Sequence, residues 1–175
     1  MTSLIRPSAD ADVTAITAIY AHAVIHGTAS FEIDPPDEAE MRRRREVLLK
    51  GGYPYLVAEI DGVVAGYAYA GPYRPRPAYG NSVEDSVYVH PDRQASGVGR
   101  ALVTALIQIC EQRGFRQMVA VIGDSASHGS IRLHESLGFT LVGVLNAIGF
   151  KHGRWLDSVL MQRPLGDGAL RLPVR

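Results

Sequence analysis

Residues Val87–Arg100 read VYVHPDRQASGVGR and join an apolar strand to a helix. Pro91 ends the strand, and Gly97 and Gly99 lie where the helix begins. The first N–H groups of a helix have no partner within it, and the helix dipole favours an anion at that end. A glycine, which has no Cβ, lets a bulky phosphate approach the backbone closely. This stretch therefore predicts a strand–turn–helix unit that binds an anionic group.

The glycine spacing distinguishes this turn from two common nucleotide-binding loops. It lacks the Lys-Ser/Thr pair of a P-loop and the three-glycine spacing of a dinucleotide-binding fingerprint. Arg93 and Arg100 add positive charge beside the turn. The residues alone thus indicate a small anionic ligand and leave its identity open.

Short strands and amphipathic helices surround this unit. We expect Asp10 or Asp12 to cap a helix that ends near His26, and Asp37 to cap a second helix that Gly51 stops. Hydrophobic periodicity predicts strands at 4–6, 55–60, 63–70, 82–89, 118–122, 140–145 and 156–161, and helices at 97–113 and 130–137. Because strands and helices do not alternate regularly, we expect a mixed α/β, α+β-like domain rather than a doubly wound sheet.

Four consecutive arginines, Arg42–Arg45, lie in the second helix. Consecutive helical residues point in different directions, so these side chains cannot form one binding stripe. We expect them to be solvated and paired with nearby glutamates.

Composition excludes several classes of protein. The chain has 175 residues, the length of one domain, and 18 Lys+Arg against 18 Asp+Glu. A nucleic-acid or anionic-membrane binder would need a basic excess, so we expect neither partner. No run approaches the apolar length of a membrane helix, and the first residues lack the apolar core of a signal peptide.

The cysteine and histidine residues indicate neither a disulfide nor a metal site. The single cysteine, Cys110, cannot form an intramolecular disulfide, and we expect a packed core thiol in a cytoplasmic protein. His22 and His26 have the spacing of a metal pair on a helix, but no further ligand is placed to complete a site. We therefore expect no metal.

Several segments carry a family resemblance. QASGVG at 94–99 resembles the pyrophosphate-binding turn of the GCN5-related N-acetyltransferases, the GNAT superfamily. Five further segments resemble one branch of this superfamily, the phosphinothricin and methionine sulfoximine N-acetyltransferases. They are GPYR at 71–74, SVEDSVYV at 82–89, AVIG at 120–123, SIRLHESLGF at 130–139 and GFKHGRW at 149–155. The resemblance runs from residue 5 to residue 162, nearly the whole chain.

This resemblance implies a GNAT fold, with a central, mostly antiparallel, twisted sheet, splayed central strands and flanking helices. It implies one N-acetyltransferase domain at 1–163 and a C-terminal tail at 164–175. The implied activity is direct acetyl transfer from acetyl-CoA, as co-substrate, to the α-amine of phosphinothricin, methionine sulfoximine, methionine sulfone or a similar small amino-acid analogue. Two alternatives stay open: acetylation of a protein or peptide N-terminus, and a non-catalytic CoA-binding regulatory module.

The resemblance also implies where acetyl-CoA binds. In the family the pantetheine arm inserts between two splayed strands, which are 82–89 and 118–122 here. Ser127 stands where the family usually has an asparagine that reaches this arm, so the chain departs from the pattern at that position. The implied co-substrate residues are Val87, Tyr88, Val89, Gln94, Ala95, Ser96, Gly97, Val98, Gly99, Arg100 and Ser127.

Two residues match catalytic positions of the family. Glu84 matches the branch's proposed base, acting directly or through a water. A free glutamate has a pKa near 4.3, and poising it near 7 would need roughly 3.7 kcal/mol of desolvation. His134 stands where many relatives place a tyrosine thought to protonate the departing thiolate, and the resemblance leaves its role as acid or base open.

A substrate of this class is a small amino acid with a second, tetrahedral oxyanion, so its site needs cations and aromatic walls. The implied contact residues are Phe31, Tyr73, Arg74, Ser82, Val83 and Glu84. In this branch the pocket is partly built across a homodimer interface. The resemblance therefore implies a homodimer in which residues 151–155 serve the neighbouring subunit.

Overall fold

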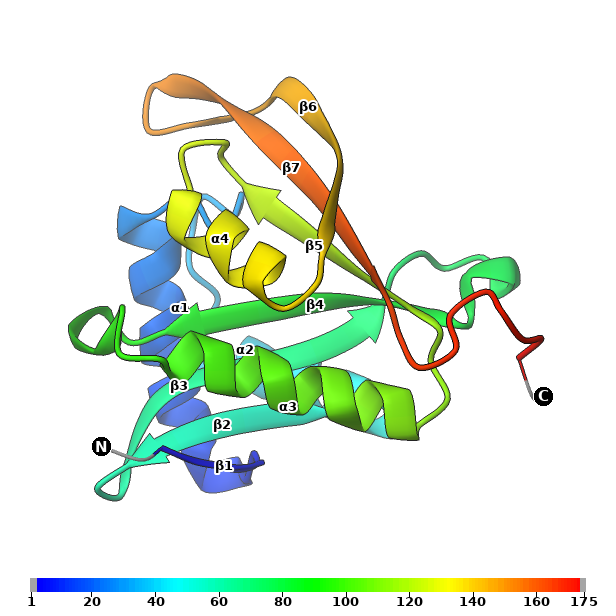
Figure 1. Ribbon diagram of the computed structural model, residues 1–175. Helices are drawn as coiled ribbons and strands as arrows, with labels where there is room; N and C mark the ends of the chain where they lie inside the picture. Colours follow the sequence, from blue (N-terminus) through cyan, green and yellow to red (C-terminus); the bar gives the residue numbers. More distant parts are fainter. Residues whose placement is uncertain (1–2, 174–175) are drawn as a thin grey trace.

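The structure, a computed structural model, describes residues 3–173 and folds them into a seven-stranded sheet flanked by four α-helices (Figure 1). The helices are α1 (Val13–His26), α2 (Glu38–Lys50), α3 (Val98–Gln112) and α4 (His128–Ser136). The strands are β1 (Leu4–Pro7), β2 (Tyr55–Ile60), β3 (Val63–Pro72), β4 (Ser82–Val89), β5 (Gln117–Gly123), β6 (Thr140–Lys151) and β7 (Arg154–Pro164). This order along the chain confirms the predicted mixed α/β class.

The sheet splits at its centre. Its strand order is β1-β2-β3-β4-β5-β7-β6, and all neighbours are antiparallel except β4 and β5. These two pair in parallel only where Ser82–Asp85 faces Gln117–Ala120. Beyond that point β4 continues to Val89 and β5 to Gly123, and the strands diverge, as Figure 1 shows. The predicted splay of the central strands is confirmed.

Two apolar cores lie on opposite faces of the sheet. α3 covers one face, where Leu102 and Leu106 are fully buried. α1 and α2 cover the other, above Val57 and Tyr67. In Figure 1, α3 and α4 lie in front of the sheet and α1 and α2 behind it. Cys110 of α3 is a packed core thiol, as predicted, and burial raises its pKa to about 12.

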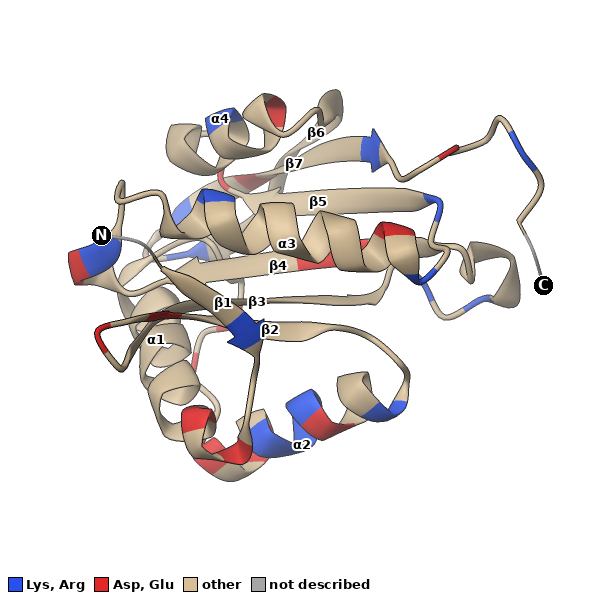
Figure 2. Cartoon of the chain, turned by 60° about the horizontal axis from the view of Figure 1, so that its bottom comes forward, with Lys and Arg blue, Asp and Glu red and all other residues tan. Residues whose placement is uncertain are grey.

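The arginines of α2 are of two kinds. Arg42–Arg44 form ion pairs with Glu38, Glu40 and Glu32, as predicted. Figure 2 shows acidic and basic residues gathered along α2, whereas most of the sheet is uncharged. Arg45 is only 6% exposed, because its Nη1 donates to Asp10 Oδ1 at 2.6 Å and its Nε to Ser8 Oγ at 2.8 Å. For Arg45 the expectation of a solvated side chain is wrong.

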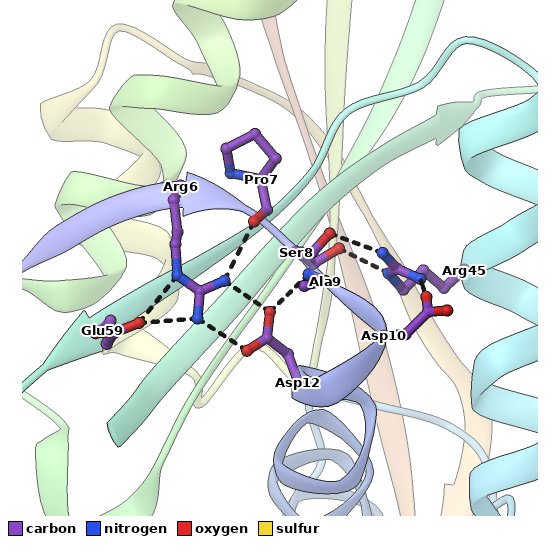
Figure 3. Close-up of polar contacts among 8 residues, drawn as sticks. All are labelled: Arg6, Pro7, Ser8, Ala9, Asp10, Asp12, Arg45 and Glu59. Carbon is purple, nitrogen blue, oxygen red and sulfur yellow. Dashed lines mark hydrogen bonds and ion pairs between the residues drawn. The ribbon is translucent and has the colours of Figure 1, made fainter. Parts of the chain in front are cut away.

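A second arginine ties the N-terminal elements together (Figure 3). Arg6 donates to both carboxylate oxygens of Asp12, at 2.7 and 2.9 Å, and to Glu59 Oε2 at 2.9 Å. Asp12 also accepts from the backbone N–H of Ala9 at 2.7 Å. We expected Asp10 or Asp12 to cap α1, but the Asp12 side chain makes no capping hydrogen bond to that helix. The Asp12 carboxylate instead joins β1, β2 and the turn before α1.

The C-terminal strands are longer than predicted. β6 runs past residue 145 to Lys151, through register shifts against β7 near Leu141 and Leu145. Such shifts interrupt the two-residue period on which the prediction relied. Leu165, just after β7, is fully buried and its N–H donates to Arg116 O. Within residues 3–173, no helix combines the length and apolar character that a membrane crossing needs.

Candidate functional site

The gap between the diverging strands holds a small cavity of about 60 Å³. Its lining comes from β4, β5, α4 and the loop after α1: Ala29, Asp85, Ser86, Val87, Tyr88, Ala120, Val121, Ile122, Gly123, Ser127, Ser130 and His134. Three predicted co-substrate residues, Val87, Tyr88 and Ser127, therefore lie here. A strand beyond its last pair leaves backbone N–H and C=O groups on one edge without a neighbouring strand. The β4 edge in this gap can therefore hydrogen-bond a ligand.

The predicted anion-binding turn lies at the start of α3. Gly97 has a φ of 86°, a left-handed conformation, and a Cβ built there would meet nothing within 4 Å. Ala95 also has a positive φ, 56°. Ser96 Oγ donates to Arg93 O at 2.5 Å, which closes the turn. The residues that surround this open helix N-terminus are exposed: Gln94, Ala95, Ser96 and Gly97.

The remaining predicted residues of the turn fix α3 in place. Val98 is buried in the core. A Cβ at Gly99 would be in ordinary van der Waals contact with Leu133 at 3.4 Å and Val89 at 3.5 Å, which places the start of α3 against β4 and α4. Arg100 Nη1 donates to Ser136 Oγ at 2.7 Å and so joins α3 to α4.

A buried ion pair forms one side of the cavity. His134 Nε2 lies 3.0 Å from Asp85 Oδ2, and its Nδ1 lies 2.8 Å from Ser130 O. The two side chains are 3% and 1% exposed, and Asp85 Oδ1 has no hydrogen-bond partner. Burial alone would lower the pKa of His134, but the hydrogen bond and charge of Asp85 outweigh it and raise that pKa above its ordinary value.

Glu84 lies on the opposite face of the sheet from Asp85, because successive strand residues point to opposite faces. Burial raises the pKa of the half-buried Glu84 carboxyl, the charge of Asp85 adds to this effect, and Arg74 opposes it. Burial also raises the pKa of Tyr69, with a contribution from the charge of Glu84. The two predicted catalytic residues, Glu84 and His134, are therefore on different faces of the sheet, and Glu84 does not line the cavity itself.

A second cavity, of about 210 Å³, lies where β4 and β5 begin. Its lining residues are Tyr73, Tyr79, Ser82, Gln117, Val119, Val142, Leu160 and Gln162. The Tyr73 ring packs edge-on against Tyr79 with centroids 5.7 Å apart, and the Arg74 guanidinium lies 5.1 Å from the Tyr73 centroid. Ser82 has the same strand phase as Glu84. Predicted substrate residues Tyr73, Arg74, Ser82 and Glu84 are thus gathered in one region.

Two predicted substrate residues are placed differently. Phe31 lies at the far end of β5, where a Cβ at Gly123 would come 2.9 Å from its ring and a Cβ at Gly149 2.5 Å. It therefore borders the first cavity rather than the second. Val83 is fully buried in the core, and β4 is paired with β3 and β5 on its two edges at this residue.

Sequence reasoning missed Asp85 and Ser130. Asp85 occupies the strand phase of Val83 and Val87, which face the core and its edge. A carboxylate in a buried phase needs a partner elsewhere in the chain, and that is the signal that could have found it. Ser130 contributes only its carbonyl, which no residue pattern marks. Among residues 3–173, no group of three or more His, Cys, Asp or Glu side chains is arranged to hold a metal ion.

Comparisons with known proteins give a consistent result. Residues 15–139 match the family model described as acetyltransferase (GNAT) family. A phosphinothricin N-acetyltransferase of Alcaligenes faecalis is 55% identical over 169 residues, which cover 97% of this chain and 86% of that protein. An L-methionine sulfoximine/L-methionine sulfone acetyltransferase of Salmonella typhimurium is 44% identical over 168 residues, which cover 94% of this chain and 96% of that protein.

A solved structure is similar over the whole chain. The crystal structure of a GNAT superfamily phosphinothricin acetyltransferase from Sinorhizobium meliloti, in complex with AcCoA, has a TM-score of 0.97 at 48% sequence identity. The match covers 100% of this chain and 95% of that chain. The splayed sheet is therefore an arrangement that this chain shares with a protein crystallised with AcCoA.

Proposed function

The chain belongs to the acetyltransferase (GNAT) family, and from this premise we propose that it transfers the acetyl group of acetyl-CoA to the α-amine of a small amino-acid analogue. The substrate class is that of phosphinothricin, methionine sulfoximine and methionine sulfone, which similar proteins carry in their names. The observation that carries the proposal is the split between β4 and β5 with an open helix N-terminus beside it.

Acetyl-CoA fits this split. Its pyrophosphate would lie at the turn 94–100, where Gly97 leaves the backbone open and the helix dipole favours an anion. Its pantetheine arm would follow the bare edge of β4 at Val87–Val89, pairing with backbone groups as a strand does. Ser127 Oγ donates to Gly123 O at 2.8 Å, so its oxygen remains able to accept an N–H of the arm.

The chemistry requires a base on the side of the amine. The amine nitrogen attacks the thioester carbonyl carbon, the C–S bond breaks, and CoA leaves as the thiolate. Glu84 takes the amine proton, directly or through a water, and its raised pKa brings it closer to the value that suits a general base. A backbone N–H on the bare edge of β4 polarises the carbonyl. No covalent enzyme intermediate forms.

The second cavity supplies the substrate pocket. Tyr73 and Tyr79 provide aromatic walls, and Ser82 provides a hydroxyl on the same face as Glu84. Arg74 lies near enough to Glu84 to affect its pKa, and its guanidinium can bind an oxyanion in two-point fashion. Phe31 borders the first cavity and would not form part of this pocket.

We further propose a homodimer built on β6. This edge strand exposes a row of large apolar side chains, and β7 adds Trp155 at 65% exposure. The exposed residues of β6 are Leu141, Val142, Val144, Leu145, Ile148 and Phe150. A long apolar edge of this kind marks an interaction site. Lys151 is buried in its own chain, with Nζ donating to Ser30 O at 2.7 Å, so Trp155 rather than Lys151 would meet the neighbouring subunit.

The single N-acetyltransferase domain at 1–163, with a tail at 164–175, and a cytoplasmic location complete the proposal. A buried, unpaired Cys110 is compatible with a reducing compartment.

The test is thiol release from acetyl-CoA in the presence of phosphinothricin, methionine sulfoximine or methionine sulfone. We expect release with at least one of them, and a fall in kcat of about 10²-fold or more for Glu84→Gln. Glu46→Gln, a matched change at an exposed site, should leave the rate unchanged. Tight CoA binding without release would point to the regulatory module, and acetylated peptides without amino-acid acetylation to the N-terminal acetyltransferase.

A further inference from the structure

The geometry around His134 restricts what this histidine can do. Ser130 O is a carbonyl and can only accept, so His134 Nδ1 at 2.8 Å must carry a proton. Nε2 lies 3.0 Å from Asp85 Oδ2, and that contact also needs a proton between the two atoms. Both ring nitrogens are therefore engaged, and the Asp85–His134 pair holds one proton more than a neutral imidazole beside a carboxylate.

Releasing that proton would disrupt the pair. A singly protonated ring would turn a lone pair either toward Asp85 Oδ2 or toward Ser130 O, and each contact would then join two acceptors. The side chains are 3% and 1% exposed, so bulk solvent does not surround them and an unpaired contact would cost free energy. The pair is thus built to keep its proton.

We propose that Asp85 is a positioning residue that holds His134 as a doubly protonated ring, so that His134 shapes the acetyl-CoA side of the site and does not take the proton of the amine. The inference rests on the proposed function and deepens it. Asp85 lies on β4, where its pairing with β5 ends, and His134 lies on α4, so their bond fixes the width of the gap between β4 and α4. Glu84, on the opposite face, is left as the group that receives the amine proton.

Few other groups face this pair. From α3, Cys110 feels the charge of Asp85, and its pKa of about 12 keeps it a neutral thiol. Phe139 packs edge-on against the His134 ring with centroids 4.9 Å apart. β5 carries no titratable residue, and Glu84 is the one other carboxylate of β4. The protonation of His134 therefore depends mainly on Asp85.

Asp85→Asn is the decisive variant, because the asparagine amide can donate to a neutral Nε2 and so preserve the contact without the charge. Nitrogen NMR of the His134 ring in the free protein at pH 7.5 should show two N–H groups in the wild type and one in Asp85→Asn. This measurement needs no turnover, so its outcome is independent of whether the acetyl acceptor has been identified. A singly protonated ring in the wild type would overturn the proposal.

Kinetics separate positioning from base catalysis. In Asp85→Asn we expect kcat/KM for acetyl-CoA to fall by about tenfold, the effect of replacing a hydrogen bond between charged groups with a neutral one, while KM for the amine stays unchanged. The acid limb of the pH–rate profile should stay in place, because it belongs to Glu84. If the acid limb instead moves to lower pH, His134 is the base and the proposal fails.

Two controls complete the experiment. Asp61→Asn makes the same change in an exposed hairpin turn, where asparagine tolerates the positive φ of 50°, and should match the wild type. Asp85→Ala, which removes the contact altogether, should lower kcat/KM for acetyl-CoA further than Asp85→Asn does. Equal losses in the two variants would indicate that the charge and the contact are not separable, against the proposal. Circular dichroism establishes that each variant is folded.

Discussion

Two of the regions in which this protein buries charged side chains do so in different ways. The edge cluster consists of Arg6, Asp10, Asp12, Arg45 and Glu59, and the second region is the Asp85–His134 pair. In the edge cluster the cations are arginines, which stay charged at all accessible pH values, and every guanidinium has several acceptors. In the pair the cation titrates, one carboxylate oxygen has no partner, and the cavity is adjacent. Burial of charge in the edge cluster thus holds the N-terminal elements together, whereas burial of the Asp85–His134 pair forms part of the candidate site.

The strongest way to break the edge cluster is Arg6→Met. Asp12, whose side chain is 8% exposed, would keep its charge but lose its cation, and we expect the free energy of unfolding to fall by about 3 kcal/mol. Urea denaturation measures the loss. Turnover of the folded variant should be normal, since the cluster lines neither cavity. Arg43→Met, at an exposed ion pair, is the matched control and should leave stability unchanged.

Arg45→Leu should have a smaller effect, a loss of about 2 kcal/mol in the free energy of unfolding. The substitution removes the guanidinium and its hydrogen bonds to Ser8 and Asp10. Asp10 is 78% exposed, so water can solvate its carboxylate in the variant. Thermal and urea unfolding of Arg45→Leu and Arg42→Leu would compare two neighbouring residues of α2. Equal losses in both would contradict the distinction between them.

The smallest effect is a pH dependence of the free energy of unfolding, of opposite sign in the two regions. The hydrogen bond from Arg6 holds the pKa of Asp12 below its ordinary 3.8, so its stabilisation is present above that pH and is lost as pH falls through the lowered pKa. The pKa of His134 is raised above 6.5, so the stabilisation from its pair is present below 6.5 and is lost as pH rises through the raised pKa.

This prediction is checked by unfolding wild type, Arg6→Met and Asp85→Asn at several pH values. The stability gap between wild type and Arg6→Met should narrow toward acid, and the gap between wild type and Asp85→Asn should narrow toward alkali. Parallel trends for both variants would show that the two regions do not differ in the way described.

Local signals predicted much of the fold. The alternation of residues 82–89 gave the bounds of β4, and the Asp37 cap, whose Oδ1 accepts from Glu40 N at 2.8 Å, marked the start of α2. Gly97 was expected at the start of α3 and has the left-handed conformation that glycine permits. In each case the deciding interaction lies within a few residues along the chain.

The features that escaped prediction depend on distant residues. Arg45 is buried, unlike Arg42–Arg44, because its guanidinium donates to Ser8 and Asp10, which lie 37 and 35 residues away in the sequence. Asp85 meets His134 across 49 residues. The end of β6 was hidden because Ala147 adopts a left-handed φ of 49° and breaks the alternation. A one-dimensional pattern carries none of these contacts.

The short parallel contact between β4 and β5 has a consequence for hydrogen exchange. Residues Ser86–Val89 pair with β3 on one edge only, so amides that point to β3 should exchange slowly and those that point to the gap quickly. A ligand lying along the gap would protect the second set and, by mass action, stabilise the whole chain. In most folds of this kind the centre of the sheet is the part best protected from exchange. In this protein the amides on the gap edge of β4 are exposed to exchange until a ligand takes the place of a neighbouring strand.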